Sequence, residues 1–108
     1  MNPSRTFLSL LIFLLAANSA PAGSYQYFRI GNKDDVQTKP AVGIAMMGGG
    51  SDLDEAFRWL CQKGNGGDFL ILRAAGNDDY NSYVNGLCKL NSVATLIIPD
   101  QKDALARQ

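Results

Sequence analysis

The chain contains no histidine among its 108 residues. This absence removes Ser-His and Cys-His catalysis, HExxH metal sites and histidine proton shuttles from anything that the chain does alone. The chain also lacks an excess of charge of either sign, because ten basic residues balance ten acidic residues. Balanced charge argues against a nucleic acid, or an acidic membrane, as a partner held mainly by electrostatics.

The glycines of the chain do not form a nucleotide-binding motif. A Gly-x-Gly-x-x-Gly pattern that begins at Gly48 would need its third glycine where Leu53 stands, and the chain has no Gly-Lys-Ser/Thr. It also has no Gly-x-Ser-x-Gly turn of the kind that carries a nucleophilic serine. We therefore predict no cofactor, no metal site and no catalytic residue in this sequence.

Long apolar runs are lacking outside the N-terminus, where residues 1–22 are typical of a secretory signal peptide. Arg5 supplies the positive start, residues 7–17 are uncharged and rich in leucine, and small residues offer a cleavage site. The alternative is a membrane anchor, but the run is well short of the roughly 20 residues that a spanning helix needs. We predict a protein of the secretory pathway, extracellular or vacuolar, without membrane contact after cleavage.

Only two cysteines are present, Cys61 and Cys88, and secretion would carry both into an oxidising compartment. A disulfide between them is possible there. However, Cys61 lies on the apolar stripe of one predicted helix, and Cys88 follows Leu87 in a second helical pattern. Because free cysteine packs as a small hydrophobe, the sequence favours two buried thiols while leaving the disulfide open.

The chain is organised around residues 41–63, which predict a buried strand, a glycine turn and an amphipathic helix. Residues 41–47 are apolar without polar alternation, which is typical of a strand covered on both faces. The glycines at 48–50 permit a sharp turn, and Ser51 is the predicted N-cap of a helix that ends near Lys63. The apolar stripe of this helix is formed by Leu53, Ala56, Phe57, Leu60 and Cys61.

Further along, residues 69–73 and 93–98 predict buried strands, and a weaker helical pattern covers residues 80–90. The alternation of strand and helix (βαβαβ) predicts an α/β fold with an open parallel sheet and flanking helices. A parallel sheet needs cover on both faces, and about two helices cannot supply it.

We therefore predict an incomplete three-layer sandwich, the front portion of a larger α/β domain. Residues 23–40, after the signal peptide, are polar and predict an extended lead-in with a weak strand near its start. Residues 41–108 are the predicted N-terminal part of this α/β domain, which the family resemblance described below implies to be hydrolase-like, and they end in a polar, helix-favouring tail.

Ligands of open α/β sheets collect at the carboxyl ends of the strands, and the glycine turn arrives there. Its backbone N–H groups could bind an anion or oxyanion at a helix N-terminus, or the turn could be only a tight connection with a capping serine. Ser51 is a poor nucleophile because no general base accompanies it. This candidate anion loop consists of Gly48, Gly49, Gly50 and Ser51.

A second candidate segment follows the predicted strand at residues 69–73. Arg73 could pair with a substrate carboxylate or with an aspartate of the loop that follows, and that loop equally fits a turn and helix cap. This candidate active-site edge consists of Arg73, Asn77, Asp78 and Asp79. Three acidic residues of the first helix are interpreted as complements of the helix dipole rather than as catalytic or metal-binding groups: Asp52, Asp54 and Glu55.

Four segments in order resemble the N-terminal part of cyanophycinase-like serine peptidases, which have the class I glutamine amidotransferase-like fold. They are GGG at 48–50, EAFRW at 55–59, GGDFLILRA at 66–74 and DDYNSY at 78–83. The resemblance covers roughly residues 42–100. It implies a three-layer α/β hydrolase that acts on peptides or isopeptides, often beside an aspartyl residue.

The nucleophilic serine turn and the histidine of that family have no counterpart in this chain, so no catalytic residue is carried over. The first hypothesis is therefore a truncated family member that is inactive alone, with a peptide or a longer homologous chain as its partner. The alternative is a small secreted binding or regulatory module that completes its sheet with a partner chain or with itself. An anion- or nucleotide-binding half-domain is a third and weaker hypothesis.

Overall fold

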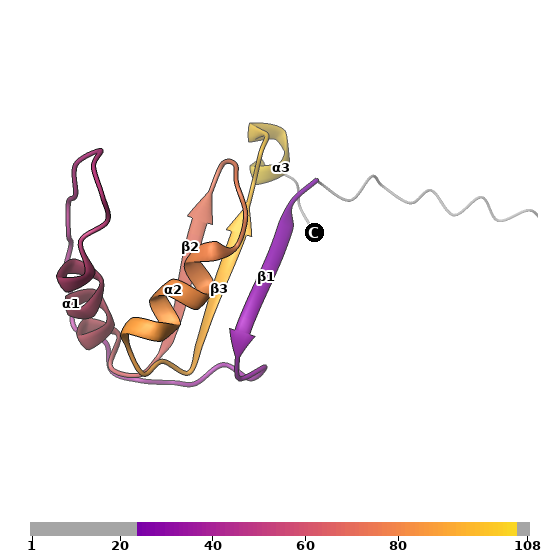
Figure 1. Cartoon of the computed structure of the whole chain (residues 1–108). Coiled ribbons are helices and arrows are strands. Elements are labelled where there is room, and N and C mark those ends of the chain that lie inside the picture. The colour runs from indigo at the N-terminus through magenta and orange to yellow at the C-terminus, as the bar shows by residue number, and fades with distance from the viewer. Residues whose placement is uncertain (1–23, 106–108) are drawn as a thin grey trace, which may run out of the picture.

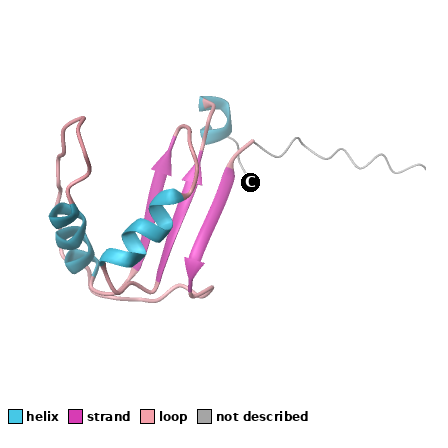
Figure 2. Cartoon of the chain, viewed as in Figure 1, coloured by secondary structure: helices cyan, strands magenta, loops and turns pink. Residues whose placement is uncertain are grey.

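The chain folds into a small α/β domain with the order βαβαβ, followed by a short helix (Figures 1 and 2). The computed structural model describes residues 24–105, so the predicted signal peptide lies outside the described residues. The elements are β1 (Gln26–Gly31), α1 (Asp54–Gly64), β2 (Asp68–Arg73), α2 (Asp79–Leu87), β3 (Ser92–Ile97) and α3 (Gln101–Leu105).

The three strands form one open mixed sheet in the order β1-β3-β2. β2 and β3 are parallel, with Phe69 opposite Val93, whereas β1 is antiparallel to β3, with Phe28 opposite Thr95. The prediction of a wholly parallel sheet is therefore wrong for β1. This strand comes from the lead-in and has no crossover helix of its own that would fix a parallel direction.

The predicted strand at residues 41–47 is absent, and this segment is an open loop that stands away from the sheet beside α1 (Figure 1). The loop is tied to α1 at its start, where the Ala41 N–H donates to the Lys63 carbonyl at 2.8 Å. A strand forms only where a neighbouring strand pairs with its N–H and C=O groups. An apolar run favours a buried strand but does not show whether such a neighbour exists. The exposed fractions are 95% for Val42, 83% for Ile44 and 94% for Met46.

Helix α1 begins three residues later than the predicted cap. Leu53, not Ser51, occupies the N-cap position, and it makes no side-chain capping bond, so the predicted capping by Ser51 is wrong. The helix ends through Asn65, which has a left-handed backbone with φ of 51° and closes the last turn. The sequence predicted that Gly64 would terminate the helix after Lys63. In the structure Gly64 is the last helical residue, and Asn65 terminates the helix.

The hydrophobic core lies between the two long helices and one face of the sheet. Its buried residues are Phe57 and Cys61 of α1, Val84 of α2 and Val93 of β3. Helix α2 lies in front of the sheet in Figure 1 and is joined to β3 by a buried hydrogen bond, in which the Thr95 hydroxyl donates to the Asn81 side chain. The two helices form one layer and the sheet forms the other.

Among the described residues no helix covers the opposite face of the sheet, where Ser92 and Ala94 of β3 are buried but the leucines of β2 are not. On β2, Phe69 and Ile71 are half-buried beneath the helices, whereas Leu70 and Leu72 alternate with them and are 56% and 66% exposed. Strand β2 therefore shows the alternation of a sheet with one solvated face, although the exposed side chains are apolar. We call this surface the bare face.

Candidate functional site

Arg73 ends β2 at the predicted active-site edge and is used to hold the loop that follows. Its guanidinium donates to the Asn77 carbonyl at 2.8 Å and lies 5.3 Å from the centre of the Tyr80 ring. The Asp79 N–H donates to the Asn77 side chain at 3.2 Å, and Asp78 takes the N-cap position of α2 without a side-chain capping bond. Within residues 24–105, Arg73 forms no ion pair, so its contacts here build the turn.

Two phenol–carboxylate pairs join α2 to the start of α1, and the sequence analysis missed them. Tyr80 donates its hydroxyl to Asp52, and Tyr83 donates to Asp54, each at 2.5 Å. The hydrogen bond to Asp54, with burial second, raises the pKa of Tyr83 to about 12. The pKa of Tyr80 is also raised, mainly by its bond to Asp52. Both phenols therefore stay protonated at neutral pH and act as donors rather than bases.

The acidic residues at 52 and 54 thus do more than complement the helix dipole. Asp54 does lie in the first turn of α1, as predicted, but its carboxylate is also the acceptor for Tyr83. Asp52 precedes the helix and ties the end of the glycine loop to α2 through Tyr80. No sequence pattern signals these pairs, because the partners are far apart in the chain and meet only when α1 packs against α2.

The glycine loop does not form an anion cradle with the rest of this edge. Nothing lies within 4 Å of the position that a Cβ atom would take at Gly48, Gly49 or Gly50, and Ser51 is exposed. Since α1 begins at Asp54, the N–H groups of this loop are also not those of the first helical turn. The structure brings Arg73, Asn77 and Asp79 together and leaves the glycine loop apart from them.

Residues 24–105 contain no group of three or more His, Cys, Asp or Glu residues placed to hold a metal ion. No helix within the same range is long and apolar enough to cross a membrane.

At the opposite end of β2 from Arg73, Asp68 is the centre of a hydrogen-bond network. Its carboxylate accepts from the Ser92 hydroxyl at 2.5 Å, from the Asn91 amide at 2.7 Å and from the Val36 N–H at 3.0 Å. Arg29 lies 3.3 Å away as an ion-pair partner. These donors, with Ser92 first, lower the pKa of Asp68 to about 2. The network fastens the lead-in to β2 and β3, and the sequence analysis did not find it.

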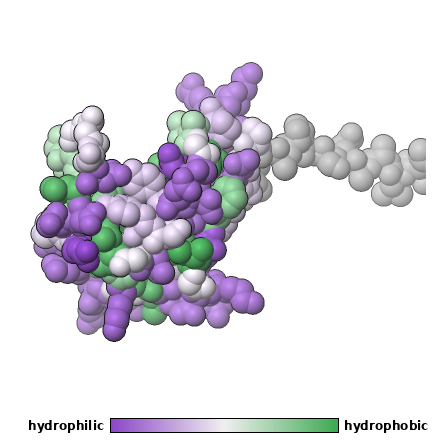
Figure 3. All heavy atoms as spheres, viewed as in Figure 1, coloured by the Kyte–Doolittle hydropathy of each residue, from purple (hydrophilic) through white to green (hydrophobic). Residues whose placement is uncertain are grey.

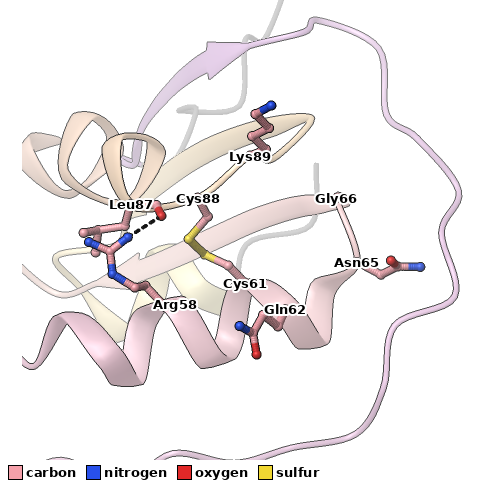
Figure 4. Close-up of a pocket in the computed structure, with 8 residues that line it drawn as sticks. All are labelled: Arg58, Cys61, Gln62, Asn65, Gly66, Leu87, Cys88 and Lys89. Atoms are coloured by element: carbon pink, nitrogen blue, oxygen red, sulfur yellow. Dashed lines mark hydrogen bonds between the residues drawn. A yellow bond between two sulfur atoms is a disulfide. The ribbon is translucent and has the colours of Figure 1, made fainter.

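Cys61 and Cys88 form a disulfide that joins α1 to the end of α2, with their Cα atoms 6.1 Å apart. The interpretation as two buried thiols is therefore wrong. The bond lies beside an open hollow of about 560 Å³ between the two helices (Figure 4). Eight residues line the hollow: Arg58, Cys61, Gln62, Asn65, Gly66, Leu87, Cys88 and Lys89.

The pairing register defines the bare face. In both ladders, residues directly opposite each other share a face, so Tyr27 lies with Leu96, and Leu96 lies with Leu72. The face seen in Figure 3 is the helix side, where hydrophilic residues prevail, whereas the bare face lies behind it. The complete bare face consists of Tyr27, Arg29, Asp68, Leu70, Leu72, Ser92, Ala94 and Leu96.

No protein-family model matches this chain, and no curated protein or solved structure is significantly similar to it. Over residues 24–105 the fold defines a small α/β domain with an open, mixed three-stranded sheet, in which β1 and β2 each have β3 as their single neighbour. The resemblance to cyanophycinase-like peptidases rests on the four sequence segments alone. The function must therefore be argued from the geometry.

Proposed function

We propose that this chain is a non-catalytic binding module that completes its sheet by pairing the free edge of β2 with the β2 edge of a second copy. The observation that carries the proposal is the exposed β2 strand. Its sequence, DFLILR, has four consecutive apolar residues and no proline, which is the composition of segments that add readily to other strands. β2 has β3 on one side only.

The backbone of β2 shows which groups are free to pair. The Arg73 carbonyl accepts from the Ile98 N–H at 2.8 Å, so the polar groups of Arg73 point toward β3. Because N–H and C=O groups alternate in direction along a strand, those of Leu70 and Leu72 point to the open edge. These two residues therefore supply the hydrogen bonds for an incoming strand.

A two-fold axis perpendicular to the sheet makes the pairing antiparallel and keeps both bare faces on one side. Leu70 then stands opposite the second copy's Leu70, and Leu72 stands opposite the second copy's Asp68. All outward-pointing groups of β2 are used in this register. In this register Arg73 stands opposite the second copy's Gly67, and its side chain lies on the helix face beside Tyr80, so the pairing rests on backbone hydrogen bonds and on the Leu70 contact rather than on charge.

Size-exclusion chromatography with light scattering of the full chain tests this proposal through Leu70→Pro. Proline at this position removes an outward N–H without removing a bond to β3, so the variant should fold and run as a monomer, whereas the parent runs as a dimer. Leu70→Ala is the matched control, because it shortens the same side chain and keeps the N–H. A parent chain that stays monomeric at high micromolar concentration would rule out the self-pairing.

A monomeric parent would leave a longer homologous chain, or an extended peptide, as the strand that completes the sheet. The bare face would still need a covering layer, since exposed contiguous apolar surface of this kind marks interaction sites. In this proposal the domain is an incomplete three-layer sandwich whose third layer comes from outside the described residues.

The second candidate function is that of a truncated relative of cyanophycinase-like peptidases, inactive by itself. The clustering of Arg73, Asn77 and Asp79 at the carboxyl edge of β2 favours it, because ligands bind at that edge in open α/β sheets. We expect the pure chain to cleave neither peptides nor isopeptides. Turnover by the parent that is lost in Ser51→Ala and kept in Ser82→Ala would contradict this candidate.

The same proposal includes the secretory pathway as the location, extracellular or vacuolar. The disulfide supports it, because such bonds persist mainly in oxidising compartments. The proposal requires neither a cofactor nor a nucleic acid.

A further inference from the structure

We propose that the Cys61–Cys88 disulfide is a thiol-exchange site that accepts a small anionic thiol, of the glutathione class, onto Cys88. The inference does not depend on the proposed sheet pairing, because the hollow lies between the helices and not at the β2 edge. Three observations carry it: the unequal burial of the two cysteines, the charge of the hollow, and its size.

The two cysteines differ in access. Cys61 is only 5% exposed and packs in the core with Phe57 and Val84, whereas Cys88 is half-buried and follows the end of α2. Both line the hollow, where the bond spans the gap between α1 and the turn (Figure 4). Exchange depends on which sulfur a thiolate can reach, and the proposal takes Cys88, the more exposed of the two cysteines, as the point of attack.

The lining of the hollow is cationic. Arg58 and Lys89 contribute positive charge, and no carboxylate is among the residues that line it. Arg58 donates one N–H to the Leu87 carbonyl at 2.9 Å and forms no ion pair in the described part of the chain, so other donors of its guanidinium remain for a carboxylate. Figure 4 shows Arg58 beside the disulfide and Lys89 on the rim, directed away from it.

The hollow also has the size of a small-molecule site. Its volume of about 560 Å³ lies within the usual range for ligand pockets. The amides of Gln62 and Asn65 add polar groups to the wall. A thiol that carries carboxylates can therefore place them near Arg58 while its sulfur approaches Cys88.

The exchange step is balanced without a further oxidant or reductant. The incoming thiolate attacks Sγ of Cys88, a new S–S bond forms there, and the Cys61–Cys88 bond breaks. Cys61 leaves as a thiolate and takes a proton from water. One disulfide replaces another, and the bound thiol becomes a mixed disulfide on Cys88.

The exchange has a structural consequence. The disulfide is the covalent tie between α1 and the end of α2. Its opening leaves α1 held to α2 by packing, by the Arg58–Leu87 hydrogen bond and by the bonds of Asp52 and Asp54. In this proposal the covalent attachment of α1 to α2 depends on the thiols present in solution.

The test is the rate at which the oxidised full chain exchanges with reduced glutathione and, separately, with 2-mercaptoethanol, followed by intact mass and peptide mapping. Rates are compared per thiolate. We expect glutathione to react about fivefold faster at low salt, because one nearby cation attracts its carboxylates, and this preference should shrink at high salt. The adduct should map to Cys88.

Arg58→Gln should abolish the preference for glutathione, and Arg58→Lys should keep part of it. Arg58→Gln also removes the hydrogen bond to the Leu87 carbonyl, but that loss would change the rates with glutathione and with 2-mercaptoethanol alike. The ratio of the two rates therefore reports the effect of the Arg58 charge. Lys63→Gln is the matched control, since it removes a cation from the same helix without touching the hollow. Equal rates for the two thiols, an adduct on Cys61, or an unchanged ratio in Arg58→Gln would overturn the proposal.

Discussion

Asp68 holds together three segments that are far apart in the chain, the lead-in, β2 and β3. Its donors come from Val36, Asn91 and Ser92, and Arg29 joins them from β1. The carboxylate matters here because it accepts several bonds at once, which a neutral side chain of the same shape cannot do. At the scale of single residues, polar contacts thus fasten this end of the sheet, while Leu70 and Leu72 of β2 remain exposed.

Replacing this residue tests the network. The pKa of Asp68 is lowered from its usual value of 3.8 to about 2 in the folded chain, so the stability it contributes is present above 3.8 and is lost as the pH falls through about 2. We expect Asp68→Asn to lower the free energy of unfolding at pH 6 and to match the parent near pH 2. Urea denaturation at both pH values measures this, with Asp34→Asn as the control. An equal deficit at both pH values would contradict it.

Among the elements, the strands β2 and β3 and the helices α1 and α2 could be predicted from the sequence. Residues 69–73 and 93–98 agree with the observed Asp68–Arg73 and Ser92–Ile97, because short apolar runs and helical stripes are local signals. The run at residues 41–47 carries the same local signal and forms no strand. Strand pairing depends on two segments of the chain, so the sequence of residues 41–47 alone does not show whether they pair.

The candidate site was predictable only in part, for the same reason. The sequence placed Arg73, Asn77 and Asp79 at one edge because they follow a strand along the chain. It missed Tyr80 and Tyr83 as partners of the acidic residues at 52 and 54, since those pairs exist only through the packing of α1 on α2. It also missed the antiparallel β1, whose direction depends on a long connection.

The disulfide links two helices, and its contribution to the free energy of unfolding can be measured directly. The two cysteines are 27 residues apart, and closing a loop of that length lowers the entropy of the unfolded chain. Loop-closure entropy predicts that the double variant Cys61→Ala, Cys88→Ala loses about 3.5 kcal/mol of unfolding free energy. Chemical denaturation checks this, and the reduced parent should agree with the variant. Hydrogen exchange should quicken most at α1, and a stability equal to that of the parent would contradict the tether.

At the scale of the whole molecule, the part of the chain at residues 24–105 has helices on one face of its sheet, and β1 and β2 each have a single described neighbour, β3. A domain this small buries a limited part of its apolar surface by itself. The bare face keeps Leu70 and Leu72 more than half exposed, and the loop at 41–47 adds further apolar surface. In the proposed pairing, a second copy would supply the backbone partners that β2 lacks among the described residues.

Association predicts a melting temperature that depends on protein concentration. If the native state is a β2-paired dimer, dilution favours the unfolded monomer by mass action, so the midpoint should fall as the chain is diluted. Far-UV circular dichroism melts of the full chain across a hundredfold concentration range would show this as a single shifting transition. Leu70→Pro should melt at one temperature at every concentration, and Leu70→Ala should shift as the parent does. A parent midpoint independent of concentration would mean that each copy folds alone, and the strand that completes β2 would then have to come from another protein.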